Sequence, residues 1–448
     1  MHWQPRGILD RSFTGLTAFS VALVALSLFV VLGPIVVRGL GAFFFRATVE
    51  HRRMMLYEFG QGDRAAVEAE VARVEAARAQ VWQFVAGFEE QLKSMGAPAR
   101  RRHAQELREI KDRLAKLLGP PPGRPPPAML RERYGRTRWD QAQLELERLL
   151  YRVEWDYSDP ARMGRQVRVP RVESFRGTAL EPMFACLEGH LEDMLRPRWT
   201  CYWRFLLDES KDAHFFGGIW PEILGTLYLT VGAIIFAVPM GVISAIYLVE
   251  YAPRGWLVGL LRTCISTLAG VPSIVFGLFG LAFFINTIHV SESKSVLAGS
   301  LTLAVLILPV IIRASEEAIR AVPFTYKEAA LSMGASRWRA ITTVTLPAAL
   351  PGILTGVVIS MGRAAGETAP IIFTAAVSVG APLALWQTLS RGTPALPWNI
   401  YNLATEHQAV DEIRHVQHGM VLTLVALVLL LNAVALVLRA RIARKLAV

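Results

Sequence analysis

Long apolar stretches occupy two separate parts of the chain. The first is a run of 25 residues without a charge, Phe13–Val37, and further apolar segments begin at Ile219. A membrane-spanning helix needs about 20 predominantly apolar residues. The pattern therefore predicts six spans, at Phe13–Val37, Ile219–Val249, Trp256–Asn286, Ser295–Ile312, Leu346–Val377 and Gly419–Leu438.

The first apolar run has the flanks of a signal peptide, because Arg6 and Arg11 precede it. However, the run is longer than the apolar region of a signal peptide, and no small-residue cleavage site follows it. We therefore expect an uncleaved membrane anchor.

A polar insert, residues 44–216, separates the first span from the others. Two series of apolar residues recur there at spacings of three and four: Val67, Val71, Val74, Val81, Val85, Phe88 and Leu92, and then Leu107, Ile110, Leu114 and Leu117. Asp63 is placed to cap the first helix, and Gly96 and Pro98 are suited to a turn between the two. The pattern predicts an antiparallel helical hairpin.

The rest of the insert is less regular. The prolines of Pro120–Pro127 are typical of a stiff polyproline linker, and the pattern after them does not resolve into elements. Cys186 and Cys201 lie in the insert, either as a disulfide or as two free thiols, while Cys264 lies in an apolar segment. No CxxC pair or Cys/His cluster is present, so no metal site is expected.

Charge separates the insert from the remainder. The chain is 53% hydrophobic and 19% charged, with a net charge of +11, and residues 44–216 hold 30 Lys/Arg and 26 Asp/Glu. A basic total is also found in nucleic-acid-binding proteins. With long apolar segments present, the preference of cytoplasmic loops for positive residues explains it better, and no nucleic acid is expected as a partner.

The short loops determine the orientation. With the N-terminus in the cytoplasm, thirteen basic residues fall on cytoplasmic flanks and four on outer flanks, which agrees with the positive-inside rule. The cytoplasmic set is Arg6, Arg11, Arg254, Arg262, Arg313, Arg320, Lys327, Arg337, Arg339, Arg439, Arg441, Arg444 and Lys445; the outer set is Arg38, Lys294, Arg391 and Arg414. Both termini are then cytoplasmic and the insert 44–216 is extracytoplasmic.

A polar stretch, Lys327–Ser336 (KEAALSMGAS), lies between the fourth and fifth spans. A short helix that ends at Gly334, followed by a second turn and a Leu-Pro entry into a span, predicts a rigid cytoplasmic projection. The stretch resembles the EAA loop of permeases in binding-protein-dependent ABC importers, at Glu328, Ala329, Ala330, Gly334, Ile341, Leu346 and Pro347. The resemblance implies that Glu328, Ala329, Ala330 and Gly334 couple the permease to an ATPase subunit.

Two ionisable residues interrupt the fifth predicted span. Arg363 is the eighteenth residue of Leu346–Val377, which predicts a position near the bilayer midplane, and Glu367 follows one helical turn later on the same face. An ionisable group there indicates function. The pair either neutralises itself until an oxyanion competes for the guanidinium, whose planar fork suits phosphate, or is a structural ion pair.

Two further stretches allow two interpretations each. Arg313, at the end of an uncharged span, either lines the inner mouth of a pathway or anchors the helix at the interface. Gly270–Gly277 (GVPSIVFG) is either a broken helix facing protein or a cavity, or a site of close helix packing through glycine.

Together these stretches resemble the phosphate branch of the importer permeases, the PstA-type subunits, over residues 217–448. The resemblance implies an all-α membrane protein with the type I ABC importer permease fold and six transmembrane helices, plus a mainly helical extracytoplasmic insert. The domains are then 1–43, 44–216 and 217–448. The implied pathway residues are Arg363, Glu367, Thr368 and Arg313.

The same resemblance implies the partners. These are a PstC-like permease, two PstB-like ATPase subunits that bind ATP and Mg²⁺, an extracytoplasmic PstS-like phosphate-binding protein and the lipid of a bacterial cytoplasmic membrane. The chain has no GxxxxGK[ST] sequence, HExxH or nucleophile elbow, so we expect no catalytic site and no cofactor in this chain.

Two rival functions remain open. The first is a permease for another oxyanion, molybdate or sulfate, which one Arg and one Glu do not exclude. The second is a membrane-anchored sensor or scaffold that works through the insert, although an anchor needs neither a charged residue within a span nor an EAA loop.

Overall fold

The computed structural model of the chain describes residues 5–123, 125, 127–156, 164–253, 255–406 and 410–446. It divides into two compact units, one formed by Met1–Ala42 with Trp203–Val448 and the other by Phe43–Tyr202. We call the first the bundle unit and the second the insert unit. Arg254, one of the basic residues on the expected cytoplasmic flanks, and residues 124 and 126 of the proline-rich stretch lie outside the described residues.

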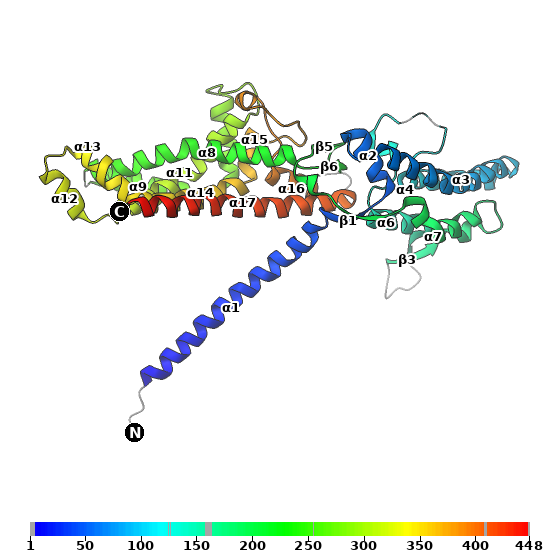
Figure 1. Ribbon diagram of the computed structural model, residues 1–448, viewed down its shortest axis with the longest axis horizontal. Coiled ribbons are helices and arrows are strands. Elements are labelled where there is room, and N and C mark those ends of the chain that lie inside the picture. The colour runs from blue at the N-terminus through cyan, green and yellow to red at the C-terminus, as the bar shows by residue number, and fades with distance from the viewer. Residues whose placement is uncertain are drawn as a thin grey trace. The chain divides into compact units, whose positions relative to one another are not determined.

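The bundle unit is built almost entirely of helices, and α8, α11, α14 and α17 run side by side in it (Figure 1). Its α-helices are α1 (Pro5–Leu40), α8 (Trp220–Ile246), α9 (Trp256–Ala269), α10 (Ser273–Gly280), α11 (Val296–Arg320), α12 (Phe324–Ser332), α13 (Arg337–Ala340), α14 (Leu346–Gly366), α15 (Ala369–Thr374), α16 (Leu396–Thr405) and α17 (Val410–Leu446). The bundle unit also has three π-helical segments among its described residues. η4 (Tyr247–Tyr251) extends α8, η5 (Leu281–Ile285) extends α10, and η6 (Ile341–Thr345) precedes α14.

Short elements complete the bundle unit. The 3₁₀ turns are η3 (Trp203–Leu206) and η7 (Leu385–Leu389), and β5 (Ser210–Lys211) pairs antiparallel with β6 (Phe216–Gly217). Residues 203–216, which the sequence analysis assigned to the insert, thus fall within the bundle unit.

Among the described residues, five helices are long and apolar enough to cross a membrane, at Phe13–Leu40, Trp220–Tyr251, Val296–Arg320, Arg337–Gly366 and Glu412–Arg444. A sixth candidate is α9 with α10 and η5, which meet at a bend of 100°. The expected all-α membrane protein is found, and the expected number of six spans is reached when the bent pair counts as one span. The bend confirms a broken helix at Gly270–Gly277.

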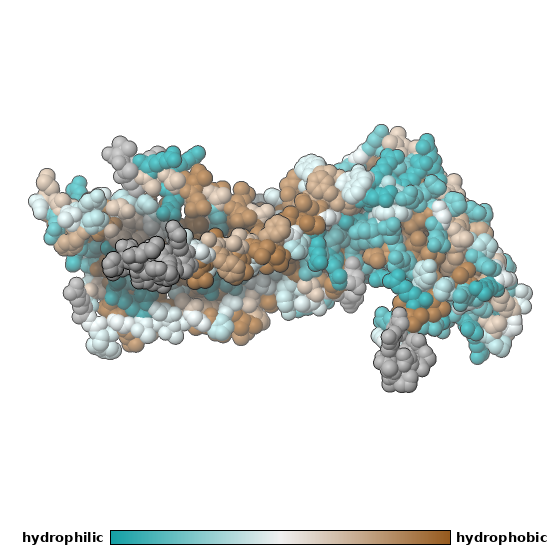
Figure 2. All heavy atoms as spheres, turned by 90° about the horizontal axis from the view of Figure 1, so that it is seen from below, coloured by the Kyte–Doolittle hydropathy of each residue, from teal (hydrophilic) through white to brown (hydrophobic). Residues whose placement is uncertain are grey.

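Small residues bring the bundle helices close together. A Cβ atom on Gly241 of α8 would lie 2.6 Å from Ile311 of α11, and one on Gly39 of α1 would lie 2.6 Å from Leu422 of α17. Such close approach of backbones is typical of membrane helices, where packing rather than hydrophobic burial drives association. Apolar residues gather over the bundle unit in Figure 2, whereas hydrophilic residues predominate over the insert unit.

The insert unit combines helices with two small antiparallel ribbons. Its elements are β1 (Phe44–Ala47), α2 (Val49–Phe59), α3 (Arg64–Ser94), α4 (Ala97–Leu118), α5 (Leu130–Arg133), α6 (Trp139–Leu150), β2 (Tyr151–Asp156), β3 (Arg165–Pro170), η2 (Arg171–Phe175), α7 (Glu181–Leu195) and β4 (Arg198–Cys201). β1 pairs with β4, and β2 pairs with β3.

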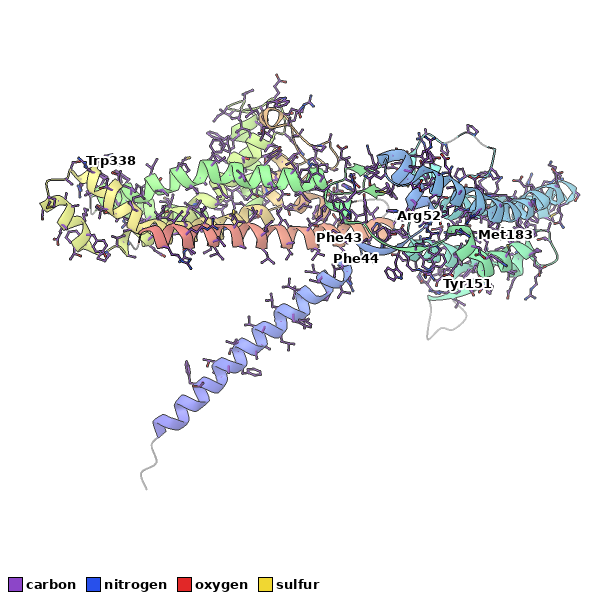
Figure 3. The ribbon with its side chains drawn as sticks, viewed as in Figure 1. Phe43, Phe44, Arg52, Tyr151, Met183 and Trp338 are labelled. Atoms are coloured by element: carbon purple, nitrogen blue, oxygen red, sulfur yellow. The ribbon has the colours of Figure 1, made fainter. Side chains whose placement is uncertain are left out.

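The predicted helical hairpin is confirmed as α3 and α4. Asp63 caps α3 by accepting hydrogen bonds from the amides of Ala65 and Ala66, and Lys111 of α4 pairs with Glu89 of α3 at 2.5 Å. The hairpin shares an apolar core with α6 and α7. Met183, labelled in Figure 3, belongs to that core.

Buried polar residues fix the helices of the insert unit. Arg78 bonds to Glu50 Oε1 and to the Leu118 carbonyl at 2.6 Å each. His51 is buried, and its pKa is lowered to about 3 by that burial first and then by the charges of Arg52 and Arg138.

The cysteines of the insert unit are not joined. Cys186 on α7 and Cys201 on β4 are both free thiols. The open choice between a disulfide and two thiols is therefore resolved in favour of the thiols in this structure.

Candidate functional site

The fifth predicted span is not one continuous helix. Its helix α14 ends at Gly366, Glu367 follows with extended backbone, and the short helix α15 starts at Ala369. The expectation of a single span Leu346–Val377 is wrong, and so is the placement of Glu367 on a continuing helical face. Pro370 explains the break, because it has no amide to donate to the carbonyl of Gly366 four residues earlier, and in a continuous helix its ring would clash with that carbonyl.

The ion pair itself forms across the helix end. Arg363 Nε lies 3.3 Å from Glu367 Oε1, and the side chains are 37% and 20% exposed. Thr368, the third residue expected here, is half-buried at the start of α15. The structure thus brings Arg363, Glu367 and Thr368 to one break in the helix, with a guanidinium only partly shielded from its surroundings.

The level of this break along the bundle follows from glycine contacts. A Cβ atom on Gly352 would lie 2.7 Å from that of Ala318, and one on Gly356 would lie 2.3 Å from that of Ala314. α14 and α11 are therefore antiparallel, and seven more residues bring Arg363 level with residue 307. That level is the middle of α11, Val296–Arg320. Ala364 and Ile307 share one apolar cluster, in agreement with this level.

A second broken helix packs beside the first. A Cβ atom on Gly277 of α10 would meet the carbonyl of Ala369 at 2.9 Å and Pro370 at 3.0 Å. The half-helix after the 100° bend thus lies against α15, so two interrupted spans adjoin. Interrupted backbone is tolerated at membrane depth where it is buried in protein or lines a cavity.

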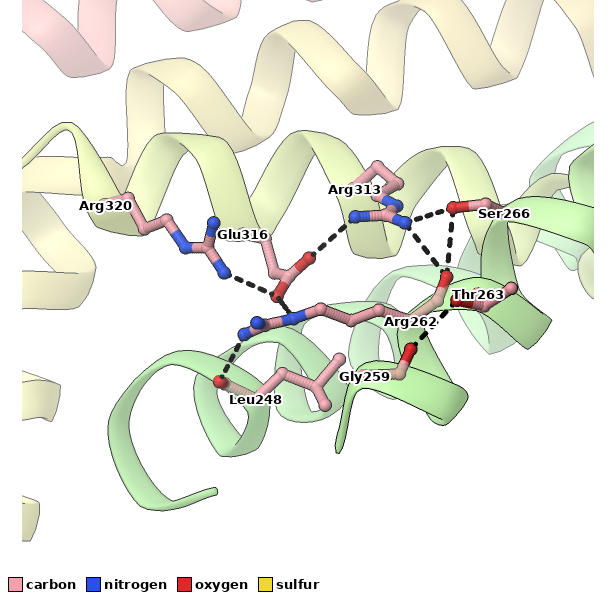
Figure 4. Close-up of polar contacts among 8 residues, drawn as sticks. All are labelled: Leu248, Gly259, Arg262, Thr263, Ser266, Arg313, Glu316 and Arg320. Carbon is pink, nitrogen blue, oxygen red and sulfur yellow. Dashed lines mark hydrogen bonds and ion pairs between the residues drawn. The ribbon is translucent and has the colours of Figure 1, made fainter. Parts of the chain in front are cut away.

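Arg313 lies elsewhere. α11 continues to Arg320, so the expectation that Arg313 ends the helix is wrong. Its guanidinium donates to the carbonyl of Arg262 at 2.9 Å and to the hydroxyl of Ser266, and it pairs with Glu316 at 3.5 Å (Figure 4). These partners lie on α9 and α11, so Arg313 joins two helices and is not brought into contact with the Arg363–Glu367 pair.

The polar stretch between α11 and α14 forms the expected projection. α12 ends before Gly334, whose φ of +83° lies in the left-handed region that glycine adopts without strain. Ser336 then caps α13 by accepting a hydrogen bond from the amide of Arg339. The prediction of a short helix that ends at a glycine and precedes a second turn is confirmed.

The projection has an anchored side and an open side. Lys327 pairs with Glu250 of η4, which ties α12 to the end of α8. Glu328 and Ala329 are exposed, and Ala330 is half-buried. Met333 is 89% exposed, and Trp338, labelled in Figure 3, is 61% exposed. The projection therefore exposes large apolar side chains as well as Glu328, which is typical of a segment that docks on another protein.

Asn432 is a polar residue near the break that the sequence analysis did not identify. Asn432 lies within α17, and its Nδ2 is 3.5 Å from the position of a Cβ atom on Gly362. Its Oδ1 is buried and has no hydrogen-bond partner among the described residues. The available signal was a single amide in an apolar run, since polar side chains within spans are rare and face the protein interior.

Comparison with known proteins places the similarity on the bundle. Residues 237–448 match the model of the family "Binding-protein-dependent transport system inner membrane component". The chain is 33% identical over 241 residues to the probable ABC transporter permease protein YqgI of Bacillus subtilis, covering 52% of this chain and 81% of that protein.

The chain is also similar to two phosphate permeases, each at 36% identity. The chain is 36% identical over 242 residues to the phosphate transport system permease protein PstA 1 of Mycobacterium tuberculosis, covering 54% of this chain and 74% of that protein. It is 36% identical over 228 residues to the PstA protein of Yersinia pestis, covering 50% and 73%.

Proposed function

We propose that this chain, which belongs to the family of binding-protein-dependent transport system inner membrane components, is the permease subunit of an ATP-driven importer of inorganic phosphate. The observation that carries the proposal is the Arg363–Glu367 pair, which lies at a break in α14 level with the middle of α11. The similarity to the PstA proteins supports phosphate as the substrate.

The pair suits a passing oxyanion for a physical reason. Guanidinium binds phosphate oxygens with two parallel hydrogen bonds, whereas the single hydrogen bond to Glu367, 3.3 Å long, engages one nitrogen of Arg363. Phosphate that reaches the break therefore displaces Glu367 and takes two donors of Arg363. When phosphate leaves, Glu367 again neutralises Arg363, so the site holds no uncompensated charge between substrates. Thr368 supplies a hydroxyl at the same break.

Force reaches this site through the projection. In this function α12 docks in a cleft of an ATPase subunit that binds ATP and Mg²⁺, and the coupling residues are Glu328, Ala329, Ala330 and Gly334. The ion pair between Lys327 and Glu250 connects α12 to α8, and η6 connects it to α14. A displacement of the projection is therefore passed to the helices that surround the break.

The assembly follows from the family. The chain is proposed to pair with a PstC-like permease above two PstB-like ATPase subunits, and to receive phosphate from a PstS-like binding protein. It spans a bacterial cytoplasmic membrane several times, with both termini in the cytoplasm and the insert unit outside. The basic flanks of the spans support this orientation.

The proposal is tested by transport. Cells that lack their own phosphate importers receive this chain with its partner subunits, and uptake of radiolabelled phosphate is measured against unlabelled molybdate and sulfate. We expect saturable phosphate uptake that the other two oxyanions compete for weakly. Uptake of labelled molybdate or sulfate in place of phosphate would transfer the assignment to that oxyanion.

A further inference from the structure

A buried carboxylate near the α12 end of the bundle unit holds three guanidiniums. Glu316 is 3% exposed, and its Oε1 lies 3.0 Å from Arg262 Nε and 3.2 Å from Arg320 Nη2, while its Oε2 lies 3.5 Å from Arg313 Nη1 (Figure 4). Within the described residues, Glu316 is the one carboxylate within 4.0 Å of these arginines. The cluster therefore carries two surplus positive charges.

Helix packing alone does not require the two surplus positive charges of the cluster. Arg262 on its own joins α9 to α11, because it contacts Glu316 and also donates to the Leu248 carbonyl at 2.9 Å. Arg320 lies on the same helix as Glu316, four residues later, and among the described residues its side chain makes no hydrogen bond or ion pair to another element. Like charges held around one carboxylate repel one another, and a bound anion offsets that repulsion.

The cluster also keeps free donors on its open side. The arginine side chains are 32%, 40% and 51% exposed, in the order Arg262, Arg313 and Arg320, although Glu316 is buried. Across the described part of the chain, Nη1 of Arg262 and Nη1 of Arg320 have no hydrogen-bond partner. A phosphoryl group, with several strong acceptor oxygens, matches such paired donors.

The position along α11 identifies the surroundings. Glu316 is 20 residues after Val296, the first residue of α11. At about 1.5 Å per residue, this rise equals the hydrocarbon thickness of a bilayer, about 30 Å. With Val296 at one face of the membrane, the cluster stands at the headgroup level of the other face. Lipid phosphates lie there, and basic pockets between helices at that level bind anionic headgroups.

We propose that Arg262, Arg313 and Arg320 form a binding site for a phosphoryl anion, supplied by an anionic lipid headgroup or by free phosphate. Glu316 orients the three guanidiniums and does not touch the anion. The site is separate from the Arg363–Glu367 pair and does not depend on phosphate being the transported substrate.

The test uses the full chain purified with its partner subunits. One arm places the complex in nanodiscs of phosphatidylcholine with phosphatidylglycerol and counts retained phosphatidylglycerol by native mass spectrometry. The other uses nanodiscs of phosphatidylcholine alone and measures bound radiolabelled phosphate by equilibrium dialysis. The variants are Arg320→Gln, which removes the guanidinium with the fewest structural contacts, and Arg441→Gln, an exposed charge on α17, as the matched control.

In at least one arm we expect Arg320→Gln to lower retention by roughly tenfold, since charge-assisted hydrogen bonds are lost, while Arg441→Gln retains the original level. A loss confined to phosphatidylglycerol identifies a lipid site, and a loss confined to phosphate identifies a site for the free anion. If Arg320→Gln does not assemble, Arg320→Lys replaces it and a smaller loss is expected. Retention equal to that of Arg441→Gln in both arms overturns the proposal.

Discussion

The sharpest consequence of the proposed function concerns Arg363. In Arg363→Gln the side chain keeps much of its length and some hydrogen-bond donors but loses its charge. A phosphate anion that passes the break in α14 then finds no fixed cation at the level of the middle of α11. We expect phosphate uptake to fall sharply, while the complex still assembles because Arg363 is only half-buried.

The size of the loss follows from the geometry. Two unit charges about 4 Å apart interact by about 4 kcal/mol at an effective dielectric constant near 20. Since Arg363 is 37% exposed, we halve this for solvent screening, to about 2 kcal/mol. That difference in the barrier corresponds to a rate about 30-fold lower, because each 1.36 kcal/mol changes a rate tenfold.

The assay must separate transport from assembly. Uptake of radiolabelled phosphate is divided by the amount of complete complex recovered from the same membranes, and Arg441→Gln is the control for loss of one positive charge. Arg363→Lys should recover little, because an ammonium lacks the two-donor fork. Glu367→Gln should bind phosphate more tightly and turn over more slowly, because Arg363 then has no competing carboxylate.

Two results would count against this reasoning. Uptake per complex within twofold of the original protein in Arg363→Gln refutes the pathway assignment. A fall in the amount of complex for both Arg363→Gln and Glu367→Gln, with unchanged uptake per complex, identifies the pair as structural, since breaking a partly buried ion pair leaves one charge uncompensated.

Three further predictions address topology, coupling and pH. In a chain whose native cysteines are replaced by serine, an impermeant maleimide should label Gly123→Cys on intact cells but not Ser336→Cys, and the reverse labelling would overturn the orientation. Gly334→Pro should leave the chain in the membrane but reduce co-purification of the ATPase, because proline cannot adopt a φ of +83°; undiminished co-purification removes the projection from the mechanism. The pKa of His51 is lowered to about 3 in the folded insert unit, because its burial disfavours the charged imidazole. The contribution of His51 to the free energy of unfolding should therefore be constant above about pH 6.5, and the stability of the insert unit should fall by up to about 1.4 kcal/mol per pH unit below that pH. Hydrogen exchange of residues 43–202 in the full chain measures this, and a flat profile contradicts the burial of a neutral imidazole.

The sequence predicted those features that depend on neighbours along the chain. Asp63 at the start of a helix, Gly334 at the end of another and the bend near Pro272 each follow from local backbone preferences, and each is present. Apolar length alone indicated where the spans lie, five as long helices and one as a bent pair, although the predicted end of the fifth was wrong. These predictions succeeded because capping, turn formation and span length are decided within a few residues of the chain.

Features that depend on tertiary contacts were not predicted. α11 extends past Arg313, where the buried Glu316 supplies a counter-charge to the arginines. The end of α14 at Gly366 was missed for a different reason, because the apolar run continues past Pro370 and outweighed that local signal. Contacts of Glu316 with Arg262, 54 residues earlier, have no signature in local periodicity. The ribbon of β1 and β4 likewise pairs segments distant in sequence, such as Phe44 with Cys201.

The two arginine sites differ in charge balance, and this difference assigns them different tasks. At the break in α14 one guanidinium faces one carboxylate, so the site is neutral when empty and an anion gains only by displacing Glu367. Such a site favours passage, because the carboxylate competes with a bound anion for the guanidinium. Around Glu316 three guanidiniums face one carboxylate, so an anion binds without displacing any group. That site favours retention, which suits a resident lipid headgroup or a holding point beside the projection better than a step in rapid transport.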